Sequence, residues 1–320
     1  MPLVSPMMPR GFALTAVLAM LLALGGCGAT PHSDRLLSNP AANLPVHHEI
    51  SSVPFHPQRA YQCGPAALAT VLRHAGVDTS PEALVPQIYV PDRRGSFQVE
   101  ILAATRKAGR LAHVIAPDLQ ALLYAVAAGQ PVLVLQNLGL DWYPRWHYAV
   151  VVGYDLAKGQ VVLRSGTTER YEMPLKLFER TWRRANLWGM VALAPGQLPA
   201  EGDGQAYFLS AAAFERSATP GQASKVWEAG VARWPRHVAL LMGDGNFRYG
   251  QNDYRGAEAR FRAAVDVDPT FAPAHNNLAQ ALLAQGQFAA AAEAAGQAIL
   301  LGGPHVETYR ETLREAEAGL

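Results

Sequence analysis

This sequence of 320 residues has few cysteines, no marked excess of positive or negative charge, and few long apolar runs. Its two cysteines, Cys27 and Cys63, are too few for a disulfide framework. Lys and Arg number 27 against 26 Asp and Glu and form no basic stripe, so the charge gives no reason to expect nucleic acid as a partner. The histidines make no metal-site spacing with cysteine or carboxylate, and we expect neither a metal nor a cofactor. Half of the residues are hydrophobic, which is enough to bury a core in most of the chain.

Residues 1–27 have the pattern of an export signal peptide. Arg10 precedes an apolar run at 12–24, which is shorter than the ~20 residues that a membrane-spanning helix needs. The run ends in Leu24-Gly25-Gly26-Cys27, which resembles a lipobox and implies cleavage before Cys27 and acylation of its thiol. Because Gly28 follows instead of aspartate, the signal resembles that of a lipoprotein anchored in the outer membrane of the cell envelope and facing the periplasm. A plain secretory signal and an uncleaved anchor helix are the alternatives.

Acylation of Cys27 would leave Cys63 without a partner in the chain, although two cysteines could in principle form one disulfide. A lone thiol in an oxidising compartment is a liability unless it is buried or used. Cys63 is therefore the first candidate for chemistry.

The rest of the chain divides by composition. Residues 28–48 are polar and rich in Pro, Asn and Ser, which predicts a flexible tether. Residues 49–195 mix helix and strand patterns and predict one α+β domain, and residues 196–204 predict a linker. Within the α+β domain we expect helices over 65–74, 97–108, 118–128 and 175–182, and strands over 131–136, 147–154, 160–164 and 187–193.

Residues 205–320 are alanine-rich, entirely helical in pattern, and repetitive. Pro235 and Pro269 lie 34 residues apart, and Pro304 follows at a near-equal interval. Small or aromatic residues recur in this register at Ala223, Ala257 and Ala291, at Trp227, Phe261 and Ala295, and at Gly230, Ala264 and Ala298. This period resembles tetratricopeptide repeats, with three units at about 205–235, 236–269 and 270–303 and a capping helix at 306–320. Such repeats imply a protein or peptide partner; an unrelated alanine-rich helical bundle is the alternative.

The segment around Cys63 has the features of a nucleophile at a helix start. Pro65 occupies a position where the first turn of a helix tolerates a missing N–H. Unsatisfied backbone N–H groups and the macrodipole stabilise an anion there, so we expect a lowered thiol pKa and fast alkylation at neutral pH. His147 opens a predicted strand and is a candidate base, and Gln58 is a candidate donor to an oxyanion.

Gln58, the block Gln62-Cys-Gly-Pro-Ala-Ala-Leu68 and the block His147-Tyr-Ala-Val-Val-Val-Gly-Tyr-Asp155 resemble the bacteriocin-leader-processing peptidases, cysteine-peptidase family 39. The resemblance covers about residues 50–195. It implies a papain-like fold with Cys63 as nucleophile, His147 as base and Gln58 as oxyanion donor, and with Gln62 as a second choice for the donor. It also implies a peptide substrate that is cleaved after small residues such as a Gly-Gly pair.

The acidic third residue of that family is missing from this sequence. If the turn between the strands at 147–154 and 160–164 centres near Ala157, His147 lies opposite about Thr167, in the stretch at 164–168, which has no carboxylate. Ser165 in this stretch occupies the position where the family's acid would align. Asp155 is about 26 Å along an extended strand from His147 and cannot replace it, whereas Asp141 in the preceding loop could reach inward. Trp142, Tyr143, Trp146 and Tyr148 surround the histidine as either core or the wall of a substrate groove.

Two functions from different classes remain open. The first is an envelope-anchored cysteine peptidase whose helical repeats recruit a substrate or partner. The second is a peptidase-like scaffold that binds peptides without cutting them, which the hydroxyl of Ser165 in place of an acid favours. Another acyl transfer by the Cys-His pair is a weaker third option.

Overall fold

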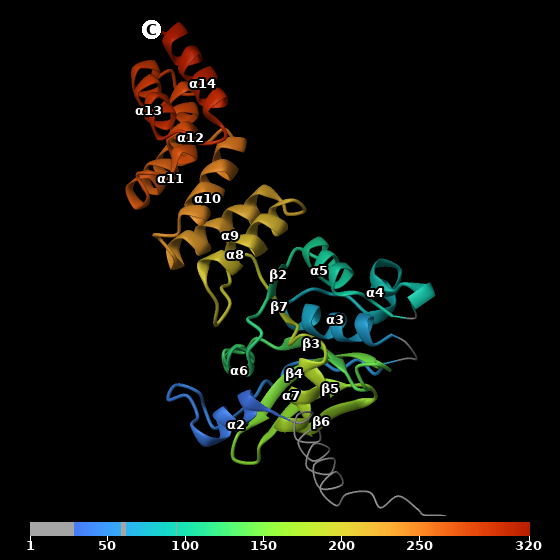
Figure 1. Cartoon of the computed structure of the whole chain (residues 1–320). Helices are drawn as coiled ribbons and strands as arrows, with labels where there is room; N and C mark the ends of the chain where they lie inside the picture. The colour runs from blue at the N-terminus through green and yellow to red at the C-terminus, as the bar shows by residue number, and fades with distance from the viewer. Residues whose placement is uncertain (1–28, 59–61, 94) are drawn as a thin grey trace, which may run out of the picture.

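The computed structural model describes residues 29–58, 62–93 and 95–320. Within them, seven strands form one antiparallel sheet in the order β2-β7-β3-β4-β5-β6, with β1 paired to β4 beyond the end of β3 (Figure 1). The strands are β1 His47–Glu49, β2 Leu111–Val114, β3 Val132–Asn137, β4 Trp146–Asp155, β5 Gln160–Ser165, β6 Thr168–Pro174 and β7 Gly189–Leu193.

Helices cover both faces of this sheet, which explains why β3 and most of β4 are buried aliphatic runs and not alternating patterns. In Figure 1, α3, α4 and α5 lie together on one side, and α2, α6 and α7 lie on the other. The helices are α2 Pro31–Ser38, α3 Cys63–His74, α4 Pro81–Ile88, the 3-10 turn η1 Pro91–Arg93, α5 Gln98–Lys107, α6 Leu119–Ala127 and α7 Leu175–Arg183.

The segment predicted as a flexible tether, 28–48, is folded onto the domain from residue 30. Helix α2 packs on α6 and α7, and Leu36 is 2% exposed. Buried Glu179 on α7 accepts hydrogen bonds from the backbone N–H groups of His32 (3.1 Å) and Ser33 (2.7 Å). These are N–H groups of the first helical turn, which have no partner inside their own helix. The polar residues that suggested a tether belong to a surface helix whose first turn is bound by the carboxylate of Glu179. The prediction of a flexible tether was therefore wrong for this stretch.

The four predicted helices and the four predicted strands of the α+β domain occur near their expected positions, but α4, β1, β2 and β6 were missed. Helix α4 carries Pro86 in its interior, which disguises its pattern. Strand β6 is exposed at six of its seven residues and lies at the sheet edge, so it has no apolar alternation.

Beyond this domain the chain is helical throughout and extends away from the sheet, with the C-terminus at the far end (Figure 1). The helices are α8 Gly204–Glu215, α9 Pro220–Arg233, α10 Val238–Gly250, α11 Tyr254–Val267, α12 Ala272–Leu283, α13 Phe288–Leu301 and α14 Val306–Ala318. The residues that recur in the 34-residue register, from Ala223 to Ala298, are buried. The order of an α+β domain followed by an all-α solenoid is confirmed.

The two domains are in direct contact. Helix α8 packs on the edge strand β2, and Tyr207, Ala211 and Phe214 join the core of the α+β domain. His113 on β2 lies 3.0 Å from the Ser210 hydroxyl, from Nδ1 to Oγ. The predicted linker is held in place as well, because the Gln130 side chain binds its backbone at residues 198 and 200. Among the described residues no helix is both long and apolar enough to cross a membrane.

Candidate active site

Cys63 is the first residue of α3, with Gln62 as its N-cap. The position is half-buried, and Gly64 brings the helix close to a neighbouring segment: a Cβ there would lie 2.5 Å from Ser96 Oγ. Burial raises the pKa of the Cys63 thiol, although hydrogen bonds from the backbone at Tyr148, Gly64 and Cys63 itself act in the opposite direction. The expected lowering of the thiol pKa is therefore not found, because loss of hydration outweighs the backbone N–H groups.

His147 is the second residue of β4 and points to the next strand. Its Nε2 lies 2.9 Å from the Oγ of Ser165 at the end of β5. Burial lowers the pKa of the imidazole. The pairing of Val150 with Arg164 and of Val151 with Leu163 is the register that a turn centred near Ala157 requires. Hairpin geometry had put about Thr167 opposite His147, whereas the hydrogen-bond partner is Ser165, the position at which the family's acid would align. The catalytic role of Ser165 stays a prediction.

Gln58 reaches the same place from the segment before α3. Its Nε2 donates to the backbone carbonyl of Tyr148 at 3.3 Å, and its own N–H donates to the carbonyl of Gly166 at 3.0 Å. The backbone of Tyr148, the residue after His147, therefore contacts both Cys63 and Gln58. The four predicted site residues converge on the start of β4 and the end of β5.

Neither acidic alternative is bonded to His147. Asp155 lies at the opposite end of β4, where its carboxylate accepts from the N–H of Lys158 at 3.0 Å. Asp141 lines a separate cavity together with Arg180, Arg183 and Arg184. Within the described ranges no three His, Cys, Asp or Glu side chains are grouped so as to hold a metal ion. Cys27, the predicted lipidation site, lies outside the described residues.

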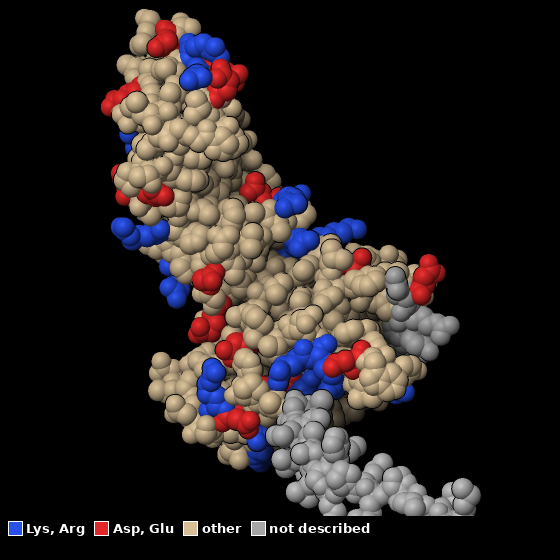
Figure 2. Space-filling model, in the orientation of Figure 1, with Lys and Arg blue, Asp and Glu red and all other residues tan. Residues whose placement is uncertain are grey.

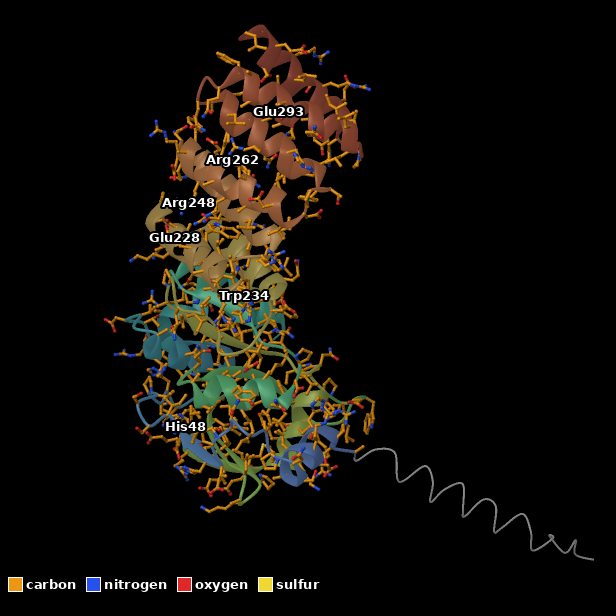
Figure 3. The ribbon with its side chains drawn as sticks, turned by 90° about the vertical axis from the view of Figure 1, so that its left-hand side faces the viewer. His48, Glu228, Trp234, Arg248, Arg262 and Glu293 are labelled. Carbon is orange, nitrogen blue, oxygen red and sulfur yellow. The ribbon has the colours of Figure 1, made fainter. Side chains whose placement is uncertain are left out.

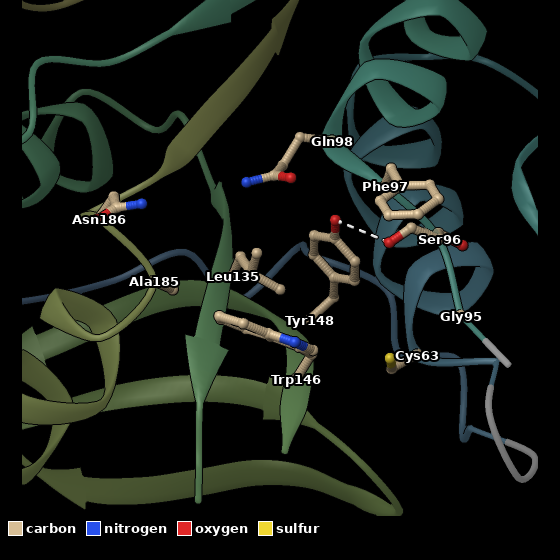
Figure 4. Close-up of a pocket in the computed structure, with 10 residues that line it drawn as sticks. All are labelled: Cys63, Gly95, Ser96, Phe97, Gln98, Leu135, Trp146, Tyr148, Ala185 and Asn186. Atoms are coloured by element: carbon tan, nitrogen blue, oxygen red, sulfur yellow. Dashed lines mark hydrogen bonds between the residues drawn. The ribbon is translucent and has the colours of Figure 1, made fainter. Parts of the chain in front are cut away.

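A cavity of about 570 Å³ opens beside Cys63 (Figure 4). Ser96, Phe97 and Gln98 form one wall, Trp146, Tyr148 and Leu135 come from the sheet, and Ala185 and Asn186 come from the loop after α7; Gly95 completes the lining. His147 lies between two lining residues on β4, and strand alternation directs it to the opposite face from Trp146 and Tyr148.

The predicted aromatic groove is present only in part. Trp146 and Tyr148 line the cavity, whereas Trp142 and Tyr143 are 81% and 61% exposed in the loop before β4. Sequence reasoning missed the walls at residues 95–98 and 185–186. For the wall at residues 185–186 the sequence offers one local signal, the asparagine at position 186. Its backbone is left-handed (φ 55°), a conformation that asparagine tolerates better than most residues.

Comparisons with known proteins agree with this architecture. Residues 50–187 match the model of the Peptidase C39 like family, and residues 244–305 match a tetratricopeptide repeat model. No curated protein matches the chain. The chain thus carries a peptidase C39-like domain followed by tetratricopeptide repeats.

Solved structures that match part of the chain include one described as a C39-like peptidase from Bacillus anthracis, at 19% identity and a TM-score of 0.41 over 46% of this chain and 97% of that one. The peptidase domain of Streptococcus ComA, a bifunctional ABC transporter, is 21% identical at a TM-score of 0.37 over 44% and 98% of the two chains. The TPR2B domain of yeast Sti1, in a complex with pHsp70, is 17% identical at a TM-score of 0.35 over 37% and 98%.

Proposed function

We propose that this chain is an envelope-anchored cysteine peptidase whose helical repeats bind a protein partner or the substrate protein. The observation that carries the proposal is the convergence of Cys63, His147 and Gln58 on the backbone of Tyr148, beside an open cavity. Thiol, imidazole and amide are the groups that acyl transfer by a cysteine requires.

The reaction begins from a neutral thiol and a neutral imidazole, since burial raises the pKa of Cys63 and lowers the pKa of His147. His147 takes the thiol proton as sulfur attacks the carbonyl carbon of the peptide. The resulting oxyanion accepts hydrogen bonds from backbone N–H groups at the start of α3 and from the Gln58 amide. His147 then gives its proton to the departing amine as the C–N bond breaks, which leaves a thioester on Cys63.

Hydrolysis of the thioester completes the cycle. A water molecule loses a proton to His147 and attacks the thioester carbonyl, the C–S bond breaks, and the sulfur regains the proton. The hydroxyl of Ser165 orients the imidazole through the 2.9 Å contact. It stabilises an imidazolium less than a carboxylate would, so we expect slow turnover.

The test is digestion of a peptide library by the full chain purified in detergent, with products read by mass spectrometry. We expect cleavage by the wild-type chain and none by Cys63→Ala or His147→Ala. A matched control is His74→Ala, which changes a histidine at the other end of α3. Equal cleavage by wild type and Cys63→Ala would refute the proposal.

A peptide-binding scaffold without turnover is the second candidate. The hydroxyl at Ser165 and the raised pKa of the Cys63 thiol favour it, because both weaken the nucleophile. Binding of the same peptides by wild type and Cys63→Ala, with cleavage by neither, would support the scaffold and exclude the peptidase.

Anchoring through an acylated Cys27 is the third part of the proposal, and it depends on the lipobox-like sequence alone. Growth of expressing cells with an alkyne-labelled fatty acid should label the wild-type chain and leave Cys27→Ser unlabelled. Incorporation of label into neither chain, with both recovered in the soluble fraction, would remove the anchor from the proposal.

A further inference from the structure

We propose that the cavity beside Cys63 binds a large apolar side chain of the substrate, of leucine or phenylalanine type, within two residues of the bond that Cys63 attacks. This inference deepens the proposed function and rests on it. It departs from the small-residue preference that the sequence resemblance implies, because a Gly-Gly pair offers no side chain to fill a cavity of about 570 Å³.

The floor of the cavity is apolar and already held in place. Leu135, Tyr148 and Ala185 are 7%, 2% and 3% exposed. The Tyr148 hydroxyl donates to the carbonyl of Ser96 at 3.2 Å, and its ring packs edge-on against Trp188. Burial raises the pKa of the Tyr148 hydroxyl, which therefore stays protonated at neutral pH. A side chain that enters the cavity meets a preformed apolar surface, which is the usual basis of affinity in ligand pockets.

The mouth of the cavity is formed by two exposed aromatic side chains. Phe97 and Trp146 are 44% and 55% exposed in the described structure and stand on opposite sides of Tyr148 in Figure 4. Exposed apolar surface beside an open cavity gains free energy when a ligand covers it. An entering leucine or phenylalanine side chain would bury part of both rings.

Polar groups at the walls suit a peptide backbone. The side-chain amides of Gln98 and Asn186 face the cavity from opposite walls (Figure 4), and neither makes a hydrogen bond to another described residue. The hydroxyl of Ser96 is buried and also lacks a hydrogen-bond partner among the described residues. Primary amides offer donors and an acceptor together, as an extended peptide requires.

The lining of the cavity disfavours an ionised side chain of the substrate. None of the residues that line the cavity is charged, so a charged group would lose hydration without gaining a counter-ion there. The carboxylate of Glu100, in the first turn of α5, acts electrostatically on the Tyr148 hydroxyl. An acidic substrate side chain is thus disfavoured both by its lost hydration and by the charge of Glu100. A basic side chain is disfavoured only by lost hydration, so the experiment must compare it with the apolar ones.

The experiment uses internally quenched peptides of Ala and Ser that differ at one residue, which is Gly, Ala, Leu, Phe or Lys. With the full chain in detergent, we expect kcat/KM to be about 10- to 100-fold higher for Leu and Phe than for Gly. The variants Phe97→Ala and Trp146→Ala should lower this ratio at least threefold. Trp142→Ala is the matched control, because Trp142 is 81% exposed outside the cavity, and should leave the ratio unchanged.

A binding series separates this inference from the proposed function. If no peptide is cleaved, the peptidase proposal fails, but the affinity of Cys63→Ala for the same peptides still reports on the cavity. Tighter binding of Leu and Phe peptides than of Gly peptides, weakened by Phe97→Ala, would support it. A preference for Gly or Lys, or equal affinities that Phe97→Ala does not alter, would overturn it even if cleavage occurs.

Discussion

The titratable side chains of Asp244 in the repeats and of Cys63 and His147 in the peptidase-like domain have different kinds of partner. In the repeats, Asp244 on α10 is fully buried, and its two oxygens accept hydrogen bonds from Arg248 Nε (3.0 Å) and Arg260 Nε (2.6 Å). Arg248 also reaches Glu228 on α9, next to it in Figure 3, at 3.3 Å. In the peptidase-like domain, half-buried Cys63 and His147 have only backbone N–H groups and the Ser165 hydroxyl as hydrogen-bond partners among the described residues.

This difference separates a structural use of buried polar groups from a chemical one. Paired charges on successive helices fix the packing of the repeats, because each charge is compensated where water is excluded. Under the proposed function, the neutral thiol of Cys63 and the neutral imidazole of His147 instead exchange a proton when a substrate arrives. Acidic and basic side chains are also interspersed over the visible surface of the repeats, as Figure 2 shows.

The largest effect should come from removing the cations around Asp244. We expect the double variant Arg248→Gln with Arg260→Gln to lose about 3–5 kcal/mol of free energy of unfolding, because it leaves a buried carboxylate without a counter-charge. Urea unfolding followed by circular dichroism measures this loss. Arg262→Gln is the matched control: its pair with Glu258 is exposed on the arginine side, and its loss should stay within about 1 kcal/mol. A double variant as stable as the control would break the comparison.

An intermediate effect is expected for Glu179→Gln. This buried carboxylate has backbone N–H groups of α2 as its hydrogen-bond partners and thus tests whether a helix N-terminus can replace a cation. We expect a loss of about 2 kcal/mol, since a charge-assisted hydrogen bond is weakened and one partner is left unsatisfied. Amide hydrogen exchange should accelerate over residues 31–38 before other segments respond. Glu169→Gln, at an exposed position, should change neither measurement.

The smallest effect is expected at the candidate active site, where the reactivity of the Cys63 thiol can be measured. Since burial raises the thiol pKa of Cys63 above its ordinary value of 9.0, alkylation by iodoacetamide should be slower than that of a free thiol at pH 7 and should rise past pH 9. Ser165→Asp should place a carboxylate beside His147, raise the imidazole pKa and so stabilise a thiolate. We expect alkylation at pH 7 to become about tenfold faster, which corresponds to one pKa unit.

Ser165→Asn is the control for this substitution, because it adds similar bulk without charge. Equal rates for the Asp and Asn variants would show that charge at this position does not reach the thiol. A wild-type rate that is already fast and independent of pH near neutrality would contradict the pKa directions assigned to Cys63 and His147.

The sequence was most informative where local rules fix position. Pro65 marked the start of α3, and strand register pointed to the stretch at 164–168, which contains the Ser165 that contacts His147. The repeat period identified which alanines and aromatics are buried. Each of these predictions follows from spacing along the chain, which a sequence contains directly.

The sequence was least informative where distant segments meet. The capping of α2 by Glu179 joins residues 146 positions apart, and no local pattern encodes it. The cavity is lined by five separate segments of the chain, of which only those at Cys63 and at Trp146 and Tyr148 had been noted. The raised pKa of Cys63 is another case, because the degree of burial depends on packing around the helix start and not on the helix itself.

Docking of the N-terminal segment leaves very little free chain. Ala29 already bonds through its carbonyl to Arg183, and α2 follows at once. A fatty acyl group on Cys27 would be separated from this fixed point by two residues, or about 7 Å of fully extended chain. If Cys27 is acylated as proposed, the peptidase-like domain would therefore be held close to the lipid surface.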